Sequence, residues 1–275
     1  MNTQAIRTKD ATFQKFEVLK TNRNKRHRHG EFFVEGVRNI NQAVKNGWAI
    51  RSFLYAEGAQ LSNWAEDLLT KVRTEVNYRL PQPLMDALSS KEDTSELLAV
   101  IAMRNDLDAS LLMHAKNPIF ALFDRPSNRG NLGTMLRSCD ALGVSGLIIT
   151  GHAVDIYDPD VVSASMGSFF SVPFVRLSGN DEIDGLIGQL RDQYQGLTVM
   201  GTTAHRKTNL FEVDMRKPML MMVGNETDGL NRHLEEISDV MATIPMSELG
   251  SASSFNVSCA ATVMFYEAIR QRMEK

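Results

Sequence analysis

Met221-Met222-Val223-Gly224-Asn225-Glu226-Thr227-Asp228-Gly229-Leu230 is the stretch that decides the fold. It begins inside the short apolar run 218–223, which is typical of a buried strand, and glycine follows that run at once. In an open parallel sheet, ligands bind in the crevice outside the carboxyl ends of the strands. Gly224 permits close approach of the backbone, so the segment is predicted to line a ligand site. The alternative is a simple turn into a helix, with Gly229 and Asn231 as turn and cap residues.

Two further segments of the last third have the same character. Ile244-Pro245-Met246 ends the apolar run 240–244, and the proline cannot continue a central strand because it lacks the N–H. Ser254-Phe255-Asn256-Val257-Ser258 then opens a long apolar segment that reaches residue 273. Serine before a helix is first a candidate cap. Capping by serine leaves Asn256 unexplained, since asparagine is a mediocre helix former with a polar amide to satisfy.

A fourth segment, Asn131-Leu132-Gly133-Thr134-Met135-Leu136-Arg137, lies upstream. Taken in their order along the chain, these segments resemble the three motifs of the SpoU (TrmH) family of RNA ribose 2′-O-methyltransferases, within the SPOUT superfamily. The resemblance implies an S-adenosylmethionine-dependent enzyme that methylates a ribose of structured RNA, with ribosomal RNA ranked before transfer RNA. It also implies an α/β fold with a C-terminal parallel-sheet SPOUT domain that contains a trefoil knot. Members are typically homodimers with the active site near the subunit interface.

The resemblance also assigns roles to residues. The implied catalytic residues are Asn131, Arg137, Glu226, Ser254 and Asn256, and the implied cofactor-binding residues are Gly224, Asn225, Gly229, Leu230, Ile244, Met246 and Phe255. Arginine is locked in its charged form, so an orienting or electrostatic role suits Arg137 better than that of a base. Glu226 is the second candidate for the base. The chain departs from the family pattern in a longer segment before Ser254, in Phe255 where leucine is usual, and in offering Asn128 beside Asn131.

The rest of the chain supports a two-domain α/β organisation. From residue 119, short apolar runs predict strands at 119–123, 146–149, 173–177, 197–200, 218–223 and 240–244, separated by helices at 131–142, 160–166, 183–194 and 255–273. Such strands describe a parallel sheet that is covered on both faces. Strands at 32–34, 50–55, 76–80 and 97–102, with helices at 37–44 and 61–72, predict a smaller α/β domain before it. We therefore expect an RNA substrate-binding domain over 12–104, a linker over 105–116 and a methyltransferase domain over 117–275.

The N-terminal end of the chain is basic although the whole chain carries a net charge of −3. Residues 1–50 hold ten Lys and Arg against four Asp and Glu, whereas the remainder holds twenty against twenty-nine. A cluster of positive charge on an otherwise acidic chain is the pattern expected of a nucleic-acid contact. The cluster predicts phosphate contacts for Lys20, Arg23, Lys25, Arg26 and Arg28; the alternative is a solvated arm. By resemblance, this domain is similar to a ribosomal protein that binds kinked RNA.

Composition limits the remaining possibilities. An apolar fraction of 43% and a charged fraction of 23% are those of an ordinary globular protein, and no apolar run approaches the length of a membrane span. Cys139 and Cys259 form no disulfide framework and have no metal-ligand spacing, so we expect a reduced cytoplasmic protein without a metal. Two other functions stay open: a catalytically inactive RNA-binding protein of the same fold, and an α/β enzyme with another nucleotide cofactor. The absence of G-x-G-x-x-G and G-x-x-x-x-G-K-[ST] counts against the last.

Overall fold

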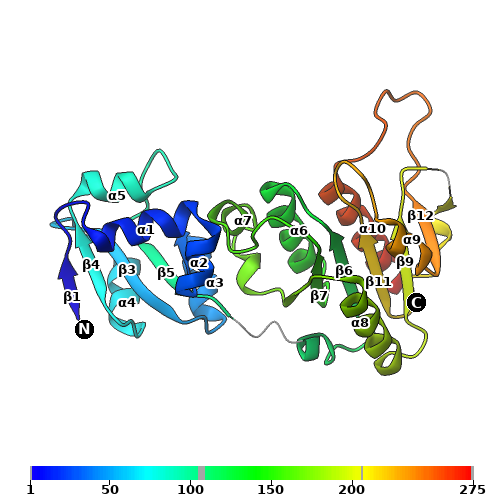
Figure 1. Ribbon diagram of the computed structural model, residues 1–275, viewed down its shortest axis with the longest axis horizontal. Helices are drawn as coiled ribbons and strands as arrows, with labels where there is room; N and C mark the ends of the chain where they lie inside the picture. Colours follow the sequence, from blue (N-terminus) through cyan, green and yellow to red (C-terminus); the bar gives the residue numbers. More distant parts are fainter. Residues whose placement is uncertain (1, 105–108, 206, 274–275) are drawn as a thin grey trace. The chain divides into compact units, whose positions relative to one another are not determined.

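The structure is a computed structural model that describes residues 2–104, 109–205 and 207–273 (Figure 1). Its contacts divide the chain into two compact units. Unit 1 consists of residues 1–105 together with 155–171, and unit 2 consists of residues 106–154 together with 172–275. Within the described residues, no helix is long and apolar enough to cross a membrane.

Unit 1 is built on a five-stranded mixed sheet with the strand order β1-β4-β3-β5-β2. The strands are β1 (Thr3–Ala5), β2 (Glu31–Glu35), β3 (Ile50–Ala56), β4 (Asn77–Leu80) and β5 (Leu98–Ala102). β1, β4 and β3 run parallel, whereas β5 is antiparallel to both of its neighbours, β3 and β2. The helices are α1 (Ala11–Thr21), α2 (Arg23–His29), α3 (Val37–Lys45), α4 (Asn63–Lys71) and α5 (Gln82–Leu88). The smaller α/β domain predicted from the sequence is therefore confirmed.

The basic run is helical and belongs to the body of unit 1. Asn22 begins α2 by accepting a hydrogen bond from the Lys25 N–H at 3.1 Å, and Gly30 ends it in a left-handed conformation. Arg26, on this helix, is only 1% exposed. Its guanidinium pairs with Asp155 at 2.8 Å and with Asp158 at 3.0 Å. The prediction that Arg26 contacts phosphate is wrong, because a buried guanidinium with two carboxylate partners cannot reach RNA.

Residues 155–171 pack with unit 1, although they were predicted to belong to the methyltransferase domain. This segment forms α7 (Pro159–Ala164) and the 3-10 helix η2 (Ser168–Phe170). Phe32 packs against both Tyr157 and Phe169, with ring centroids 5.0 and 5.5 Å away, and Trp48 packs on Phe169 at 5.3 Å. Aromatic rings bury more apolar area than any other side chains, so this cluster explains why the segment belongs to unit 1.

Of the linker predicted over 105–116, residues 105–108 lie outside the described part of the chain. The following residues form η1 (Ala109–Leu112). Leu112 is 1% exposed and packs into the core of unit 2. The end of the predicted linker thus contributes to the second unit.

Unit 2 contains a seven-stranded sheet in the order β10-β12-β9-β11-β6-β7-β8. The strands are β6 (Ile119–Asp124), β7 (Gly146–Thr150), β8 (Phe174–Leu177), β9 (Thr198–Thr202), β10 (Thr208–Asn209), β11 (Met219–Val223) and β12 (Val240–Thr243). Every pairing in this sheet is parallel, which confirms the predicted sheet type. The trefoil knot stays a prediction.

Helices cover both faces of this sheet, as the nearly all-apolar strands require. Alternate side chains of the strands, including Phe120 and Leu220, share a core with α8 (Asn180–Gln193) and α9 (Arg232–Glu236). The opposite face carries α6 (Arg129–Ala141) and α10 (Val257–Met273), which pack side by side (Figure 1). The Ser138 and Thr262 hydroxyls join α6 to α10 at 2.7 Å. η3 (Leu210–Glu212) lies between β10 and β11 in the chain.

Candidate active site

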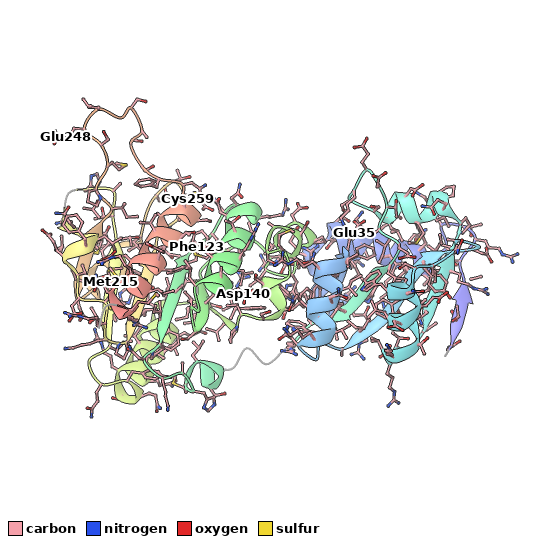
Figure 2. All side chains as sticks on the ribbon, turned by 180° about the vertical axis from the view of Figure 1, so that it is seen from behind. Glu35, Phe123, Asp140, Met215, Glu248 and Cys259 are labelled. Carbon is pink, nitrogen blue, oxygen red and sulfur yellow. The ribbon has the colours of Figure 1, made fainter. Side chains whose placement is uncertain are left out.

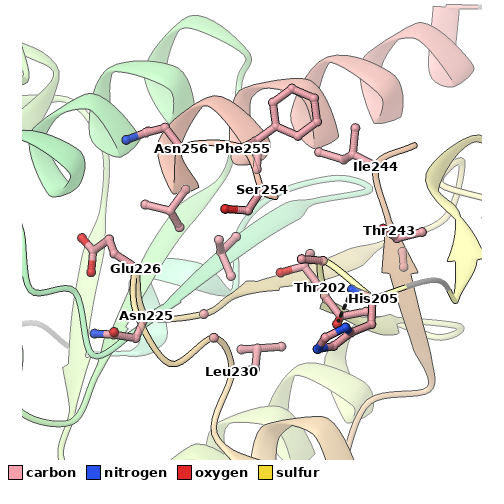
Figure 3. Close-up of a pocket in the computed structure, with 18 of the residues that line it drawn as sticks. Thr202, His205, Asn225, Glu226, Leu230, Thr243, Ile244, Ser254, Phe255 and Asn256 are labelled. Atoms are coloured by element: carbon pink, nitrogen blue, oxygen red, sulfur yellow. Dashed lines mark hydrogen bonds between the residues drawn. The ribbon is translucent and has the colours of Figure 1, made fainter. Parts of the chain in front are cut away.

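A cavity of about 620 Å³ opens at the carboxyl ends of the central strands of unit 2 (Figure 3). Segments that follow β6, β9, β11 and β12 form its walls, and the start of α10 closes one side. The volume lies within the range of small-molecule sites, and the position is the one that parallel sheets use for ligands. The lining includes all of the predicted cofactor-binding residues, namely Gly224, Asn225, Gly229, Leu230, Ile244, Met246 and Phe255.

The segment 224–231, here called the cofactor loop, folds back on itself. Asn225 and Gly229 exchange backbone hydrogen bonds at 2.9 and 3.1 Å, and Gly229 adopts a φ of 73°. A Cβ atom on Gly224 would lie 2.2 Å from the carbonyl carbon of Gly229 and 2.2 Å from the backbone nitrogen of Leu230. The close turn therefore requires glycine at position 224, for a steric reason that the sequence alone did not supply.

Three of the predicted catalytic residues form one hydrogen-bonded chain. The Asn256 amide donates to Asn131 Oδ1 at 3.0 Å, and the Asn131 amide donates to Glu226 Oε1 at 3.1 Å. A carboxylate only accepts, so Asn131 must present its NH₂ to Glu226 and its oxygen to Asn256. Ser254 lines the same cavity. The structure thus brings Asn131, Glu226, Ser254 and Asn256 together at one site.

Glu226 is held by more donors than a free base would have. Besides Asn131, its carboxylate accepts the Ser127 N–H at 3.0 Å, the Ser127 hydroxyl at 2.7 Å and the Asn128 N–H at 3.2 Å. Partial burial opposes ionisation, but the hydrogen bonds from Ser127 and Asn131 outweigh it and lower the pKa of Glu226. A carboxylate with a lowered pKa is a weaker base, so the geometry favours Glu226 as a residue that positions Asn131.

The two asparagines of the first motif have different tasks. Asn128 begins α6 by accepting the N–H of Asn131 at 3.0 Å, whereas the side chain of Asn131 turns to the cavity. At the start of α10, Asn256 accepts the N–H of Ser258 at 3.0 Å, so Asn256 is itself the helix cap. The serines that precede it were candidate caps from the sequence, and the structure gives this task to Asn256. Asn256 combines a capping oxygen with an amide aimed at Asn131.

Arg137 is the exception among the predicted catalytic residues. It is exposed on α6 and does not line the cavity of its own chain. Exposed apolar side chains lie on the neighbouring α10 and just before it: Val263 is 40% exposed and Tyr266 60% on the helix, and Phe255 is 44% exposed two residues before its start. An exposed apolar stripe on a helix commonly marks an interaction surface.

Comparison with known proteins decides the family. The family model described as SpoU rRNA Methylase family matches residues 118–266, and the SpoU L30e-like domain matches residues 10–99. The chain belongs to the SpoU rRNA methylase family. The resemblance drawn from the sequence motifs is thereby confirmed.

Individual family members extend this comparison. A 23S rRNA (uridine(2479)-2′-O)-methyltransferase of Streptomyces viridochromogenes is 42% identical over 98% of this chain and 92% of that protein. The crystal structure of the SpoU methyltransferase AviRb from that organism, in complex with AdoMet, matches with a TM-score of 0.90 over 96% of this chain and 99% of that chain. The 23S rRNA (guanosine-2′-O-)-methyltransferase RlmB of Vibrio vulnificus is 32% identical over 85% of this chain and 98% of its own length.

Some residues of this SpoU-family site were missed from the sequence. Thr202, Thr203 and His205 line the cavity at the carboxyl end of β9, and Figure 3 shows Thr202 and His205 across the cavity from Glu226. Their place after a buried strand was the available signal, as it was for Gly224. Ser258 was missed as well: its hydroxyl donates to the Asn131 carbonyl at 2.8 Å and ties α10 to α6.

The longer segment before Ser254 projects from unit 2, with Glu248 on it (Figure 2). Leu249 on this segment is 99% exposed. The Ser247 carbonyl accepts the Gly250 N–H at 3.1 Å, which makes a local turn. The departure from the SpoU pattern therefore forms an external loop, while the residues at its base, Met246 and Ser254, line the cavity.

The predicted RNA-binding residues all lie in unit 1. Arg23, Lys25 and Arg28 are exposed on α2. Lys20 is half-buried and donates to the Ser89 carbonyl at 3.2 Å. Desolvation lowers the pKa of Lys20, against the opposing effect of Glu35 and other acids. In the described part of the chain, no cluster of three His, Cys, Asp or Glu side chains is placed to hold a metal.

Proposed function

We propose that this protein transfers a methyl group from S-adenosylmethionine to a ribose 2′-oxygen of ribosomal RNA, most directly large-subunit RNA. The observation that carries the proposal is that one cavity combines apolar walls with the Asn256–Asn131–Glu226 hydrogen-bonded chain. The names of the relatives support the substrate class, since both relatives described above are 23S rRNA 2′-O-methyltransferases.

The cavity fits the cofactor in size and chemistry. Leu230, Ile244, Met246 and Phe255 supply apolar surface for a flat adenine. The turn at Gly224 exposes backbone groups where the polar parts of the cofactor need partners. When bound there, S-adenosylmethionine supplies an electrophilic methyl on a sulfonium.

The protein residues have to orient the ribose and stabilise the negative charge that develops on its 2′-oxygen. The 2′-oxygen forms the new bond to the methyl carbon and releases its proton to solvent, while the carbon–sulfur bond breaks. Asn131 and Asn256, fixed by Glu226, offer directed polar groups beside the cavity. Arg137 does not line the cavity of its own chain, so in this proposal the permanently charged Arg137 of a second subunit stabilises the oxygen as its negative charge develops. We keep the assigned catalytic and cofactor roles as parts of this proposal.

The inactive alternative has less support. The relatives described above are named as 2′-O-methyltransferases, and Asn131, Glu226, Ser254 and Asn256 are all present at one cavity of this chain. An enzyme with another nucleotide cofactor lacks the usual phosphate loops.

Ribose-methylation mapping tests the function directly. Cells with and without the intact gene are compared, and the same RNA is treated in vitro with purified protein and S-adenosylmethionine. We expect one 2′-O-methyl group in large-subunit ribosomal RNA to depend on the protein. A dependent site in transfer RNA alone would reverse the substrate ranking, and no dependent site in any RNA would contradict the proposal.

We further propose that α2 contacts RNA phosphates through Arg23, Lys25 and Arg28. So dense a set of exposed charges suits the backbone of RNA better than its base edges. Replacing all three by glutamine should weaken binding across RNA sequences and lower the slope of log K against log salt by roughly one unit per lost contact.

Filter binding at several salt concentrations measures this slope. The control is the double variant Lys71→Gln with Arg73→Gln, which removes two exposed charges elsewhere in unit 1. Its slope of log K against log salt should equal that of the wild type. An unchanged slope in the α2 variant would show that the RNA surface lies elsewhere. Cofactor affinity should stay constant throughout, because the cavity belongs to unit 2.

We propose that the protein is a homodimer joined through Val263 and Tyr266, which are exposed on α10, together with the exposed Phe255 just before that helix. These side chains leave apolar area in water that a second copy would cover. The cytoplasm is the proposed compartment, since ribosomal RNA is the proposed substrate and both cysteines are free thiols.

A further inference from the structure

Asp124, the last residue of β6, carries a buried carboxylate outside the site described above. It is 0% exposed, and its oxygens accept the Thr150 hydroxyl at 2.8 Å and the backbone N–H of Asn231 at 3.0 Å. Arg125 donates to the same carboxylate through Nε at 3.0 Å and Nη2 at 2.9 Å. Both bonds end on Asp124 Oδ2, and two charge-assisted bonds from one guanidinium fix its orientation.

Arg125 in turn forms hydrogen bonds to the cofactor loop at two points. Its Nη2 donates to the Gly229 carbonyl at 3.1 Å, and its own carbonyl accepts the Asn225 amide at 2.7 Å. Asn231, at the end of the loop, is bound to Asp124. The start, the turn and the end of the loop are thus all tied to two consecutive residues.

The backbone at Arg125 supports a dedicated role for this residue. Its φ is 46°, a left-handed conformation that side chains other than glycine and asparagine rarely adopt. The hydrogen bonds to Asp124 and Gly229 hold it there. Gly151 leaves room for the side chain, since a Cβ at that position would lie 2.7 Å from Arg125 Cγ.

We propose that Arg125, oriented by Asp124, is a positioning residue that sets the affinity for the cofactor. Arg125 does not line the cavity, whereas Gly229 and Leu230 on the cofactor loop do. A loop that is already held in its binding shape loses less conformational entropy when the ligand binds. The inference rests on the proposed function, because the ligand of this loop is the methyl donor.

Arg125→Ala tests the inference in the full chain. Calorimetry with S-adenosylhomocysteine should give a dissociation constant raised about tenfold, as expected for the loss of hydrogen bonds to a charged group. The KM for S-adenosylmethionine should rise by a similar factor, whereas kcat at saturating cofactor should stay within about twofold. A general loss of folded protein would lower kcat and leave the KM unchanged.

Two further variants separate the side chain from the backbone. Arg125→Gly relieves the left-handed conformation but removes the side chain, and should match Arg125→Ala in affinity. Arg125→Lys keeps the positive charge but loses the paired Nε and Nη2 donors of the guanidinium, and should give an intermediate dissociation constant. Arg232→Ala is the matched control, because this arginine at the start of α9 is 88% exposed and pairs with Glu236 one turn along the same helix. The affinity of this variant should equal that of the wild type.

The results distinguish this inference from the function on which it rests. If the wild type binds S-adenosylhomocysteine and Arg125→Ala binds it equally well, the positioning role is overturned and the proposed function stands. A fall in kcat with an unchanged KM, in a variant whose circular dichroism shows the same folded fraction as the wild type, would overturn it too, since Arg125 would then act on the RNA or on the chemistry. A wild type that binds no S-adenosylhomocysteine would overturn the proposed function and this inference together.

Discussion

Replacing Gly224 by alanine is expected to abolish cofactor binding. The added Cβ would lie 2.2 Å from backbone atoms of both Gly229 and Leu230, far inside contact distance. These are main-chain atoms of the loop that lines the cavity, so no side-chain rotation relieves the clash. We expect the affinity for S-adenosylhomocysteine to fall by about 1,000-fold or more, which corresponds to ~4 kcal/mol.

Calorimetry on the full chain measures the loss, and circular dichroism checks that the fold persists. Gly188→Ala is the matched control, because Gly188 lies exposed on α8 with no atom within 4 Å of an added Cβ. That change should leave affinity unaltered and stabilise the helix by about 1 kcal/mol. Wild-type affinity in Gly224→Ala would mean that the loop opens freely and does not hold the ligand.

The sequence predicted this cavity well because its parts are local. Gly224, Ile244 and Phe255 each lie at or near the end of a strand or the start of a helix that apolar periodicity reveals. Parallel strands bring their carboxyl ends to one edge, so these segments converge without further information. The element ends were less well predicted: α10 begins at Val257, where the sequence suggested 255.

Ion pairs between residues far apart in the chain could not be predicted from the sequence. Arg26 is buried by Asp155 and Asp158, which lie more than a hundred residues away, and nothing local distinguishes it from its exposed neighbours Lys25 and Arg28. A basic run interpreted as a possible arm is a helix instead. Asn22 and Gly30, its cap residues, were the local signals that could have revealed it.

Arg125 illustrates a third kind of limit. The tripeptide Asp124-Arg125-Pro126 follows a predicted strand, so its position at the ligand edge was accessible. The left-handed backbone of Arg125 and its bond to Gly229 depend on a loop a hundred residues later. Local rules would have assigned glycine or asparagine to such a conformation. Residues that break a local rule are expected at functional sites, and this one lies directly behind the cofactor loop.

Arg137→Ala is expected to lower methyl transfer by about two orders of magnitude, or ~3 kcal/mol of transition-state stabilisation, with cofactor affinity nearly intact. Affinity should persist because Arg137 is exposed on α6 and does not line the cavity of its own chain. Single-turnover methylation of the target RNA and calorimetry with S-adenosylhomocysteine separate the two effects. Arg191→Ala, an exposed arginine of α8, is the control and should react at the wild-type rate.

The position of Arg137 outside its own cavity also predicts how two defective variants behave together. If the proposed dimer places Arg137 of one subunit at the cavity of the other, Arg137→Ala and Gly224→Ala should complement each other. Half of the dimers formed by random reassortment would be mixed, and each would hold one complete site. The mixture should then regain about a quarter of wild-type activity, although neither variant is active alone. No recovery, with subunit exchange verified by mass spectrometry, would show that Arg137 acts within its own subunit. A wild-type rate for Arg137→Ala alone would remove it from the catalytic residues altogether.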